Sequence, residues 1–134
     1  MIDLKFAEEY RYPSAHEIVS VPIRIRPPGS LPFEQRAVLD TGAAVSRFDK
    51  SILPRAGITD ITAGQPMKTI TADNTEYQCY VHLIEIEFMG HVMTIPAAFC
   101  DDWDNVQNLL GMRGFFEQML AAFDHARRKF YFVI

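Results

Sequence analysis

Residues 37–43 read Ala37-Val38-Leu39-Asp40-Thr41-Gly42-Ala43, an apolar run that ends in an acidic residue closely followed by glycine. The apolar run predicts a buried strand that ends at Leu39 and delivers the Asp40 carboxylate into a tight turn. Gly42 permits a close approach of the backbone at that turn. An isolated aspartate of this kind more often caps a turn than takes part in chemistry. Its meaning therefore depends on the segments around it.

Short strand-like segments separated by turns surround this stretch. Residues 18–26 alternate between apolar and polar side chains, and Pro22 among them indicates an edge position or a bulge. Residues 67–88 predict a long hairpin that reverses at an Asp-Asn pair. Apolar residues over 115–123 recur at helical spacing and predict a helix of two to three turns. The chain ends in an apolar strand over 130–134, which we expect to be covered within the fold or by a second subunit.

Composition excludes several classes of protein. The chain has 134 residues and a formal charge of -4, which leaves no broad basic surface for nucleic acid. An acidic N-terminus without the basic start of a signal peptide predicts a cytoplasmic protein with no membrane segment. Cys79 and Cys100 lie 21 positions apart without a Cys-x-x-Cys pair, and we interpret them as reduced thiols on strands. The four histidines match no compact metal-binding spacing, so no metal or other cofactor is expected.

Four segments, in this order along the chain, resemble the retropepsin-like aspartic proteases, the single-lobe relatives of pepsin that include retroviral and bacterial enzymes. They are the active-site loop at residues 38–43, the hairpin tip Thr71, Ala72, Asp73, Asn74 and Thr75, the segment Leu109, Leu110 and Gly111, and residues 123–134. The resemblance covers residues 18–134. It implies an all-β fold, a closed retropepsin-like acid protease barrel with one short C-terminal helix. We expect one such domain over residues 1–134, with residues 1–17 an unassigned N-terminal extension.

The resemblance also implies a chemistry, that of an aspartic endopeptidase with Asp40 as its catalytic residue. In this family two carboxylates share one proton and activate a water that attacks the scissile amide. This chain has a single Asp-Thr-Gly, so the resemblance implies a homodimer in which each copy supplies one Asp40. Because Ala43 cannot donate a hydrogen bond to the carboxylate, we expect activity at mildly acidic to near-neutral pH.

The other matching residues receive supporting roles from the same resemblance. Thr41, Gly42 and Ala43 would support the active-site loop, and residues 109–111 would support it from behind. Residues 71–75 would form a flap over an extended polypeptide substrate.

Two other functions stay open from the sequence. A catalytically silent module with the same fold could bind peptides or dimerise, because the hairpin tip has Asp73 and Asn74 where many relatives have glycine, and Ala44 lacks a polar side chain. A hydrolase that depends on Cys79 or Cys100 is the weaker alternative. The acidic loop at residues 101–104 is expected to be mobile and solvated.

Overall fold

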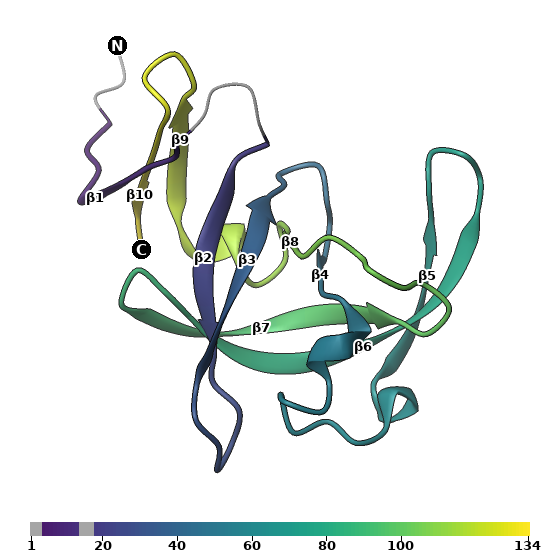
Figure 1. The fold of residues 1–134 in the computed structure, drawn as a ribbon. Helices are drawn as coiled ribbons and strands as arrows, with labels where there is room; N and C mark the ends of the chain where they lie inside the picture. The colour runs from purple at the N-terminus through teal and green to yellow at the C-terminus, as the bar shows by residue number, and fades with distance from the viewer. Residues whose placement is uncertain (1–3, 14–17) are drawn as a thin grey trace.

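The computed structural model describes residues 4–13 and 18–134, and the regular secondary structure of these residues is almost entirely β (Figure 1). Seven strands form the larger sheet, in the spatial order β2 (Ser20–Ile25), β3 (Phe33–Leu39), β8 (Leu109–Leu110), β4 (Ser46–Arg47), β7 (His91–Cys100), β6 (Glu76–Phe88) and β5 (Gln65–Ile70). A further pairing of β2 with β6 closes all of them except β5 into a barrel. The closed all-β barrel expected from the sequence is therefore confirmed.

Alternation along the strands places the apolar side chains inside this barrel. In β2, Val21, Ile23 and Ile25 are buried, and the residues between them are half-buried or exposed. Pro22 pairs with Arg36 of β3, and β2 has its second neighbour, β6, only at Arg24 and Ile25. Pro22 therefore lies on the open part of an edge, as its missing N–H predicts.

A second sheet of three strands, β1 (Glu8–Arg11), β10 (Lys129–Val133) and β9 (Leu120–Asp124), lies beside the barrel. The apolar C-terminal strand β10 is its central strand, so it is covered within the fold, by β9 and by residues 8–11 of the unassigned extension. Phe88 of β6 contacts Phe130 and Phe132 of β10 and joins the two sheets in one core. The rest of the extension described here, residues 4–7 and 12–13, contains no strand.

The helix predicted over residues 115–123 is wrong in extent. One 3-10 turn, η3 (Phe116–Gln118), is followed directly by strand β9, which pairs with β10 from Leu120 to Asp124. A helix of this length is marginal on its own, and pairing with β10 gives the same backbone hydrogen-bond partners along one of its edges. The described residues contain two further 3-10 turns, η1 (Lys50–Ile52) and η2 (Ile61–Ala63). None of the helical segments described is long enough to span a membrane.

The interpretation of the cysteines as reduced thiols is also wrong. Cys79 of β6 and Cys100 of β7 are directly opposite each other in the antiparallel pair, and they form a disulfide bond. Residues in opposite positions of such a pair have their β carbons within bonding reach of a disulfide. The hairpin register that aligns them depends on a turn 10 or more residues away, at Met89 and Gly90, so sequence spacing does not reveal it.

We expect the disulfide to stabilise the folded chain. Reduction should lower the free energy of unfolding by about 3 kcal/mol, because the bond closes a loop between residues 21 positions apart and restricts the unfolded state. Urea unfolding with and without a reducing agent measures the change. The double variant Cys79→Ala/Cys100→Ala is the control, since the reducing agent should not affect it. Two free thiols in the untreated protein, or equal unfolding midpoints, would contradict the expectation.

Candidate active site

Asp40 follows the last residue of β3, where a parallel pairing with β8 fixes the end of the strand. Val38 lies opposite Leu109 and Leu39 opposite Leu110. The Asp40 N–H then donates to the Leu110 carbonyl at 3.0 Å. The structure thus brings the predicted supporting segment into direct contact with the backbone of the predicted catalytic residue.

The turn after β3 orients the Asp40 carboxylate. The Gly42 N–H donates to Asp40 Oδ1 at 2.9 Å, and the Ala43 N–H donates to the Asp40 carbonyl at 3.2 Å. A β carbon at residue 42 would lie 3.2 Å from the same Oδ1, so glycine at this position avoids a close contact with the carboxylate. Asp40 is half-buried, whereas Thr41 and Gly42 are exposed. The carboxylate is therefore held by the backbone and remains open to solvent.

Gly111 anchors the far side of the loop. Any β carbon there would lie 2.7 Å from the Ala43 carbonyl oxygen and 2.8 Å from the Val45 carbonyl carbon, so only glycine fits. The Gly111 N–H donates to Ser46 Oγ at 3.0 Å, and Ser46 is fully buried. The next N–H along the chain, that of Met112, donates to the Ala43 carbonyl at 2.9 Å. Ser46 had no signal in the sequence, because its role depends on a partner 65 residues away.

The predicted flap residues form the tip of the β5–β6 hairpin. The Thr71 N–H donates to the Thr75 carbonyl at 2.9 Å, and the Thr75 N–H donates to Asp73 Oδ1 at 3.1 Å. The hydroxyl of Thr71 also donates to Asp73, and these bonds hold the pKa of Asp73 below its usual value. Asn74 has a φ of 64°, in the left-handed region that glycine and asparagine tolerate best. Many relatives have glycine at this hairpin tip. Here Asn74 adopts the left-handed backbone conformation that glycine permits.

A hollow of about 360 Å³ lies between the active-site loop and β5. Residues 42–45 form one wall and residues 67–70 form the other, with Arg47, Ala98 and Leu109 completing the lining. The Asp40 carboxylate lies beside this hollow, because it accepts a hydrogen bond from Gly42, which lines the hollow. We call this hollow the cleft.

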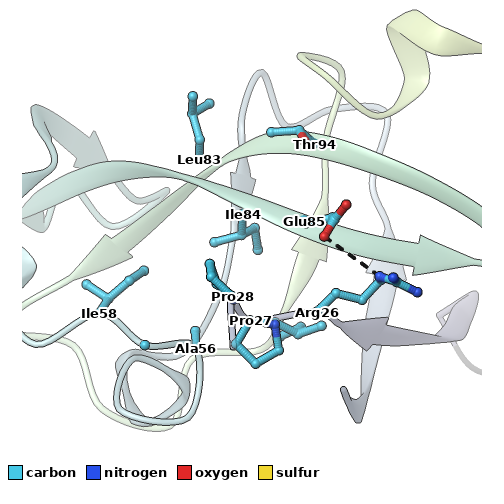
Figure 2. A pocket seen from close by; sticks show the side chains of 11 residues that line it. Arg26, Pro27, Pro28, Ala56, Ile58, Leu83, Ile84, Glu85 and Thr94 are labelled. Carbon is cyan, nitrogen blue, oxygen red and sulfur yellow. Dashed lines mark ion pairs between the residues drawn. The ribbon is translucent and has the colours of Figure 1, made fainter. Parts of the chain in front are cut away.

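A second hollow of about 370 Å³ is lined by residues 25–28, 56–58 and 83–85, together with Thr94 (Figure 2). Its charged residues pair with each other, because Arg26 Nε lies 3.7 Å from Glu85 Oε2. None of the predicted site residues lines it, and we assign no chemistry to it.

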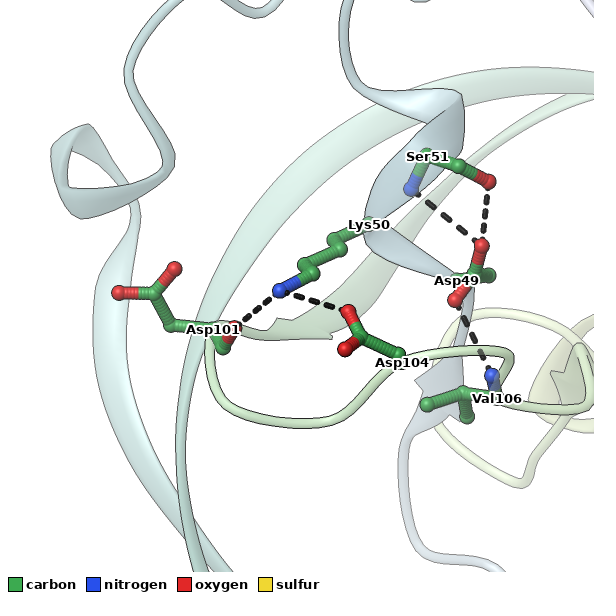
Figure 3. Close-up of polar contacts among 6 residues, drawn as sticks. All are labelled: Asp49, Lys50, Ser51, Asp101, Asp104 and Val106. Carbon is green, nitrogen blue, oxygen red and sulfur yellow. Dashed lines mark hydrogen bonds and ion pairs between the residues drawn. The ribbon is translucent and has the colours of Figure 1, made fainter.

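The acidic loop at residues 101–104 has exposed aspartates, as expected of a solvated loop, and it also contacts the barrel. Lys50 Nζ donates to the Asp101 carbonyl at 2.5 Å and lies 3.0 Å from Asp104 Oδ1, and Asp49 accepts a hydrogen bond from the Val106 N–H at 3.0 Å (Figure 3). The Trp103 ring, in the middle of the loop, stacks on Tyr77 with 4.3 Å between centroids. The loop therefore contributes an aromatic surface that is supported by β6.

Arg47 is the second residue of this region that sequence reasoning missed. Its guanidinium lies 4.3 Å from the centre of the Trp103 ring, a cation–π contact. Burial lowers the pKa of Arg47, and the negative charge of Asp40 acts in the opposite direction. Arg47 therefore places a positive charge within electrostatic reach of the predicted catalytic carboxylate.

Among the described residues, the cysteines, His82 and His91 supply no alternative centre. Both cysteines are in the disulfide bond, so the hydrolase that depends on a free thiol is excluded by this structure. The His82 ring bonds to the Ile61 carbonyl, and His91 pairs with Glu8 of β1. Over residues 4–13 and 18–134, no group of three His, Cys, Asp or Glu side chains is placed to hold a metal ion.

Ser46 provides a stability test of the loop anchor. We expect Ser46→Ala to lower the free energy of unfolding by about 1–3 kcal/mol, because the Gly111 N–H would lose its partner in a buried position. Ser30→Ala is the matched control, since Ser30 is exposed in a turn and should change stability little. Chemical denaturation of the three proteins measures the difference. Equal losses in both variants would show that the buried hydrogen bond is not the cause.

Comparison with known proteins identifies the family of this chain. No curated protein matches the chain. Among solved structures, the EIAV protease in complex with the inhibitor HBY-793 matches with a TM-score of 0.51 and 15% identity, over 72% of this chain and 83% of that chain. At this identity the likeness shows the retropepsin fold alone. The family model described as aspartyl protease matches residues 21–113, which hold Asp40, the hairpin tip and Gly111. The chain therefore belongs to the aspartyl protease family.

Proposed function

We propose that this protein is an aspartic endopeptidase whose active site forms when two copies of the chain meet. The observation that carries the proposal is the placement of Asp40, which a backbone turn holds at the edge of a cleft under the β5–β6 hairpin. Family membership supports a protease-type function, and the fold supports the arrangement. The roles of Thr41, Gly42 and Ala43 in the loop, and of residues 71–75 as a flap, belong to the same proposal.

The chemistry requires two carboxylates. One ionised Asp40 takes a proton from a water molecule, and the resulting hydroxide adds to the carbonyl carbon of the scissile amide. The protonated Asp40 of the other copy gives its proton to the carbonyl oxygen. The tetrahedral diol then collapses: one of its hydroxyls returns a proton to the ionised carboxylate, the C–N bond breaks, and the amine leaves with the proton of the other carboxylate. One carboxylate cannot act as base and acid in the same step, so one chain alone is half of the catalyst.

The small sheet supports the proposal of a homodimer. Strand β9 lies at the end of that sheet, and no described residue pairs with its outer edge. Leu120 and Phe123 on this strand and Ile134 at the chain end are 48%, 42% and 47% exposed. Apolar side chains beside an open edge favour association with a further strand. Figure 1 shows this sheet and the β5–β6 hairpin on opposite sides of the barrel.

An extended polypeptide fits the proposed cleft. The cleft is walled by a loop and a strand, and its apolar lining includes Val45, Met67, Ile70 and Leu109. A peptide in β conformation presents alternate side chains to such walls. The rival proposal is a silent peptide-binding module with the same fold, and it differs only in the absence of hydrolysis. Location in the cytoplasm and the lack of a nucleic-acid partner stay predictions; the disulfide is more typical of an oxidising compartment.

Cleavage of casein from pH 3 to 8 tests the proposed activity. We expect the wild type to cleave and Asp40→Asn to lose at least about a thousandfold in rate at every pH, because the amide cannot act as base. Asp60→Asn is the matched control, since Asp60 Oδ1 accepts the Thr62 N–H at 2.9 Å in the same kind of turn, outside the cleft. Loss of activity in both variants would point to a general effect on folding. Binding without cleavage by a folded dimer would favour the silent module.

Mixing the two proteins tests the shared site. A tenfold excess of Asp40→Asn should reduce the activity of the wild type to about one tenth, because most wild-type copies would then have an inactive partner. An equal excess of Asp60→Asn should not reduce it. Mass measurement in solution should show a dimer at the concentrations used. Unchanged activity after full subunit exchange would contradict a site built from two Asp40 residues.

A further inference from the structure

Arg47 is a cleft residue whose charge has no counter-ion in the part of the chain that the structure describes. Its Nε atom is buried without a hydrogen-bond partner, and no carboxylate among the described residues lies within ion-pair distance of its guanidinium. The other cation of the cleft, Lys68, is exposed and pairs with Glu76 at 3.2 Å. A partly buried charge without a partner is costly, so the position favours an anion that arrives with a ligand.

The surroundings hold the guanidinium in place for such an anion. Arg47 belongs to β4, which pairs with β7 at Ala98 and with β8 at Leu109. Its guanidinium lies on the Trp103 ring, and Trp103 in turn stacks on Tyr77. The side chain is thereby fixed at the cleft wall before a ligand binds, which lowers the entropy cost of binding.

Asp40 does not serve as the missing counter-ion. The Asp40 carboxylate accepts its hydrogen bond from Gly42, and it influences Arg47 only as a charge at longer range. The charges of the protein also disfavour a polyanion as the natural occupant. The protein has a net charge of -4, and Glu76, which pairs with the cleft residue Lys68, places a further carboxylate beside this region. The available position suits one carboxylate among neutral and apolar groups.

We propose that Arg47 determines specificity by binding one acidic side chain, Glu or Asp, of an extended polypeptide substrate in the cleft. The inference rests on the proposed endopeptidase function and names its substrate class. A guanidinium presents parallel N–H groups that match a carboxylate, and such charge-assisted pairs are among the strongest hydrogen bonds in proteins. The apolar residues Val45, Met67 and Leu109 favour neutral or apolar neighbours on either side of the acidic residue.

Peptide pairs that differ only by Glu or Gln at one position test the proposal. The peptides form a set in which the Glu or Gln occupies each position in turn of an otherwise uncharged sequence. Each peptide is treated with the wild type, with Arg47→Met and with Arg55→Met. At one position of the set, we expect the wild type to show a kcat/KM about tenfold higher for the Glu peptide, and Arg47→Met to treat both peptides alike. Arg55→Met is the matched control, because the Arg55 guanidinium lies 4.1 Å from the Phe33 ring and outside the cleft. It should keep the Glu preference.

Charge reversal and a binding measurement complete the test. Arg47→Glu should favour Lys over Gln at the same position, which loss of folding would not produce. Affinities of Asp40→Asn and Asp40→Asn/Arg47→Met for the peptide pairs, measured by fluorescence anisotropy, need no hydrolysis. A Glu preference in binding that depends on Arg47, without cleavage by the wild type, would refute the endopeptidase and keep this inference. Equal affinity for both peptides, no binding of either, or a preference that survives Arg47→Met would overturn it.

Discussion

The parallel pairing of β3 with β8 is the contact on which the candidate site depends. It brings two segments 71 residues apart together, and it fixes where β3 ends and where Asp40 enters its turn. The close approach of Gly111 to the backbone of residues 43 and 45 then holds the loop from behind. Ser46, buried beneath it, satisfies the N–H that this approach would leave unpaired. The carboxylate itself needs only Gly42 to orient it, because the surrounding backbone is already in place.

Much of this arrangement could be predicted from the sequence, since local patterns carry it. The apolar run before Asp40 indicated β3, and the Asp-Asn pair indicated the turn at the hairpin tip. Both are formed by residues close together in the chain. The small residue at 111 could be recognised because the Leu-Leu-Gly pattern belongs to a family, although its physical reason, a contact with residues 43 and 45, is visible only in the fold.

The features that the sequence did not predict all depend on register or on long-range packing. The disulfide needs Cys79 and Cys100 in opposite positions of β6 and β7, and the Arg47–Trp103 contact joins residues of β4 and a distant loop. The helix expected over 115–123 had the right apolar spacing, but pairing of β9 with β10 provided more than a short isolated helix offers. Periodicity describes one segment at a time, so it cannot weigh such alternatives.

The edge strands of the two sheets differ in charge and in exposed apolar side chains, and this difference bears on where a second copy of the chain would pair. Strand β1 presents Glu8, Glu9 and Arg11 at its edge of the small sheet, and β5 contains Pro66 and Lys68. Charges and proline discourage pairing with another chain. Strand β9 carries no charge before Asp124 and exposes apolar side chains. The edge that is least protected therefore lies in the sheet of the chain termini, where a partner strand would leave the β5–β6 hairpin free on the other side of the barrel (Figure 1). Activity that requires such a partner would rise with protein concentration, and each chain would stay inactive while it is alone.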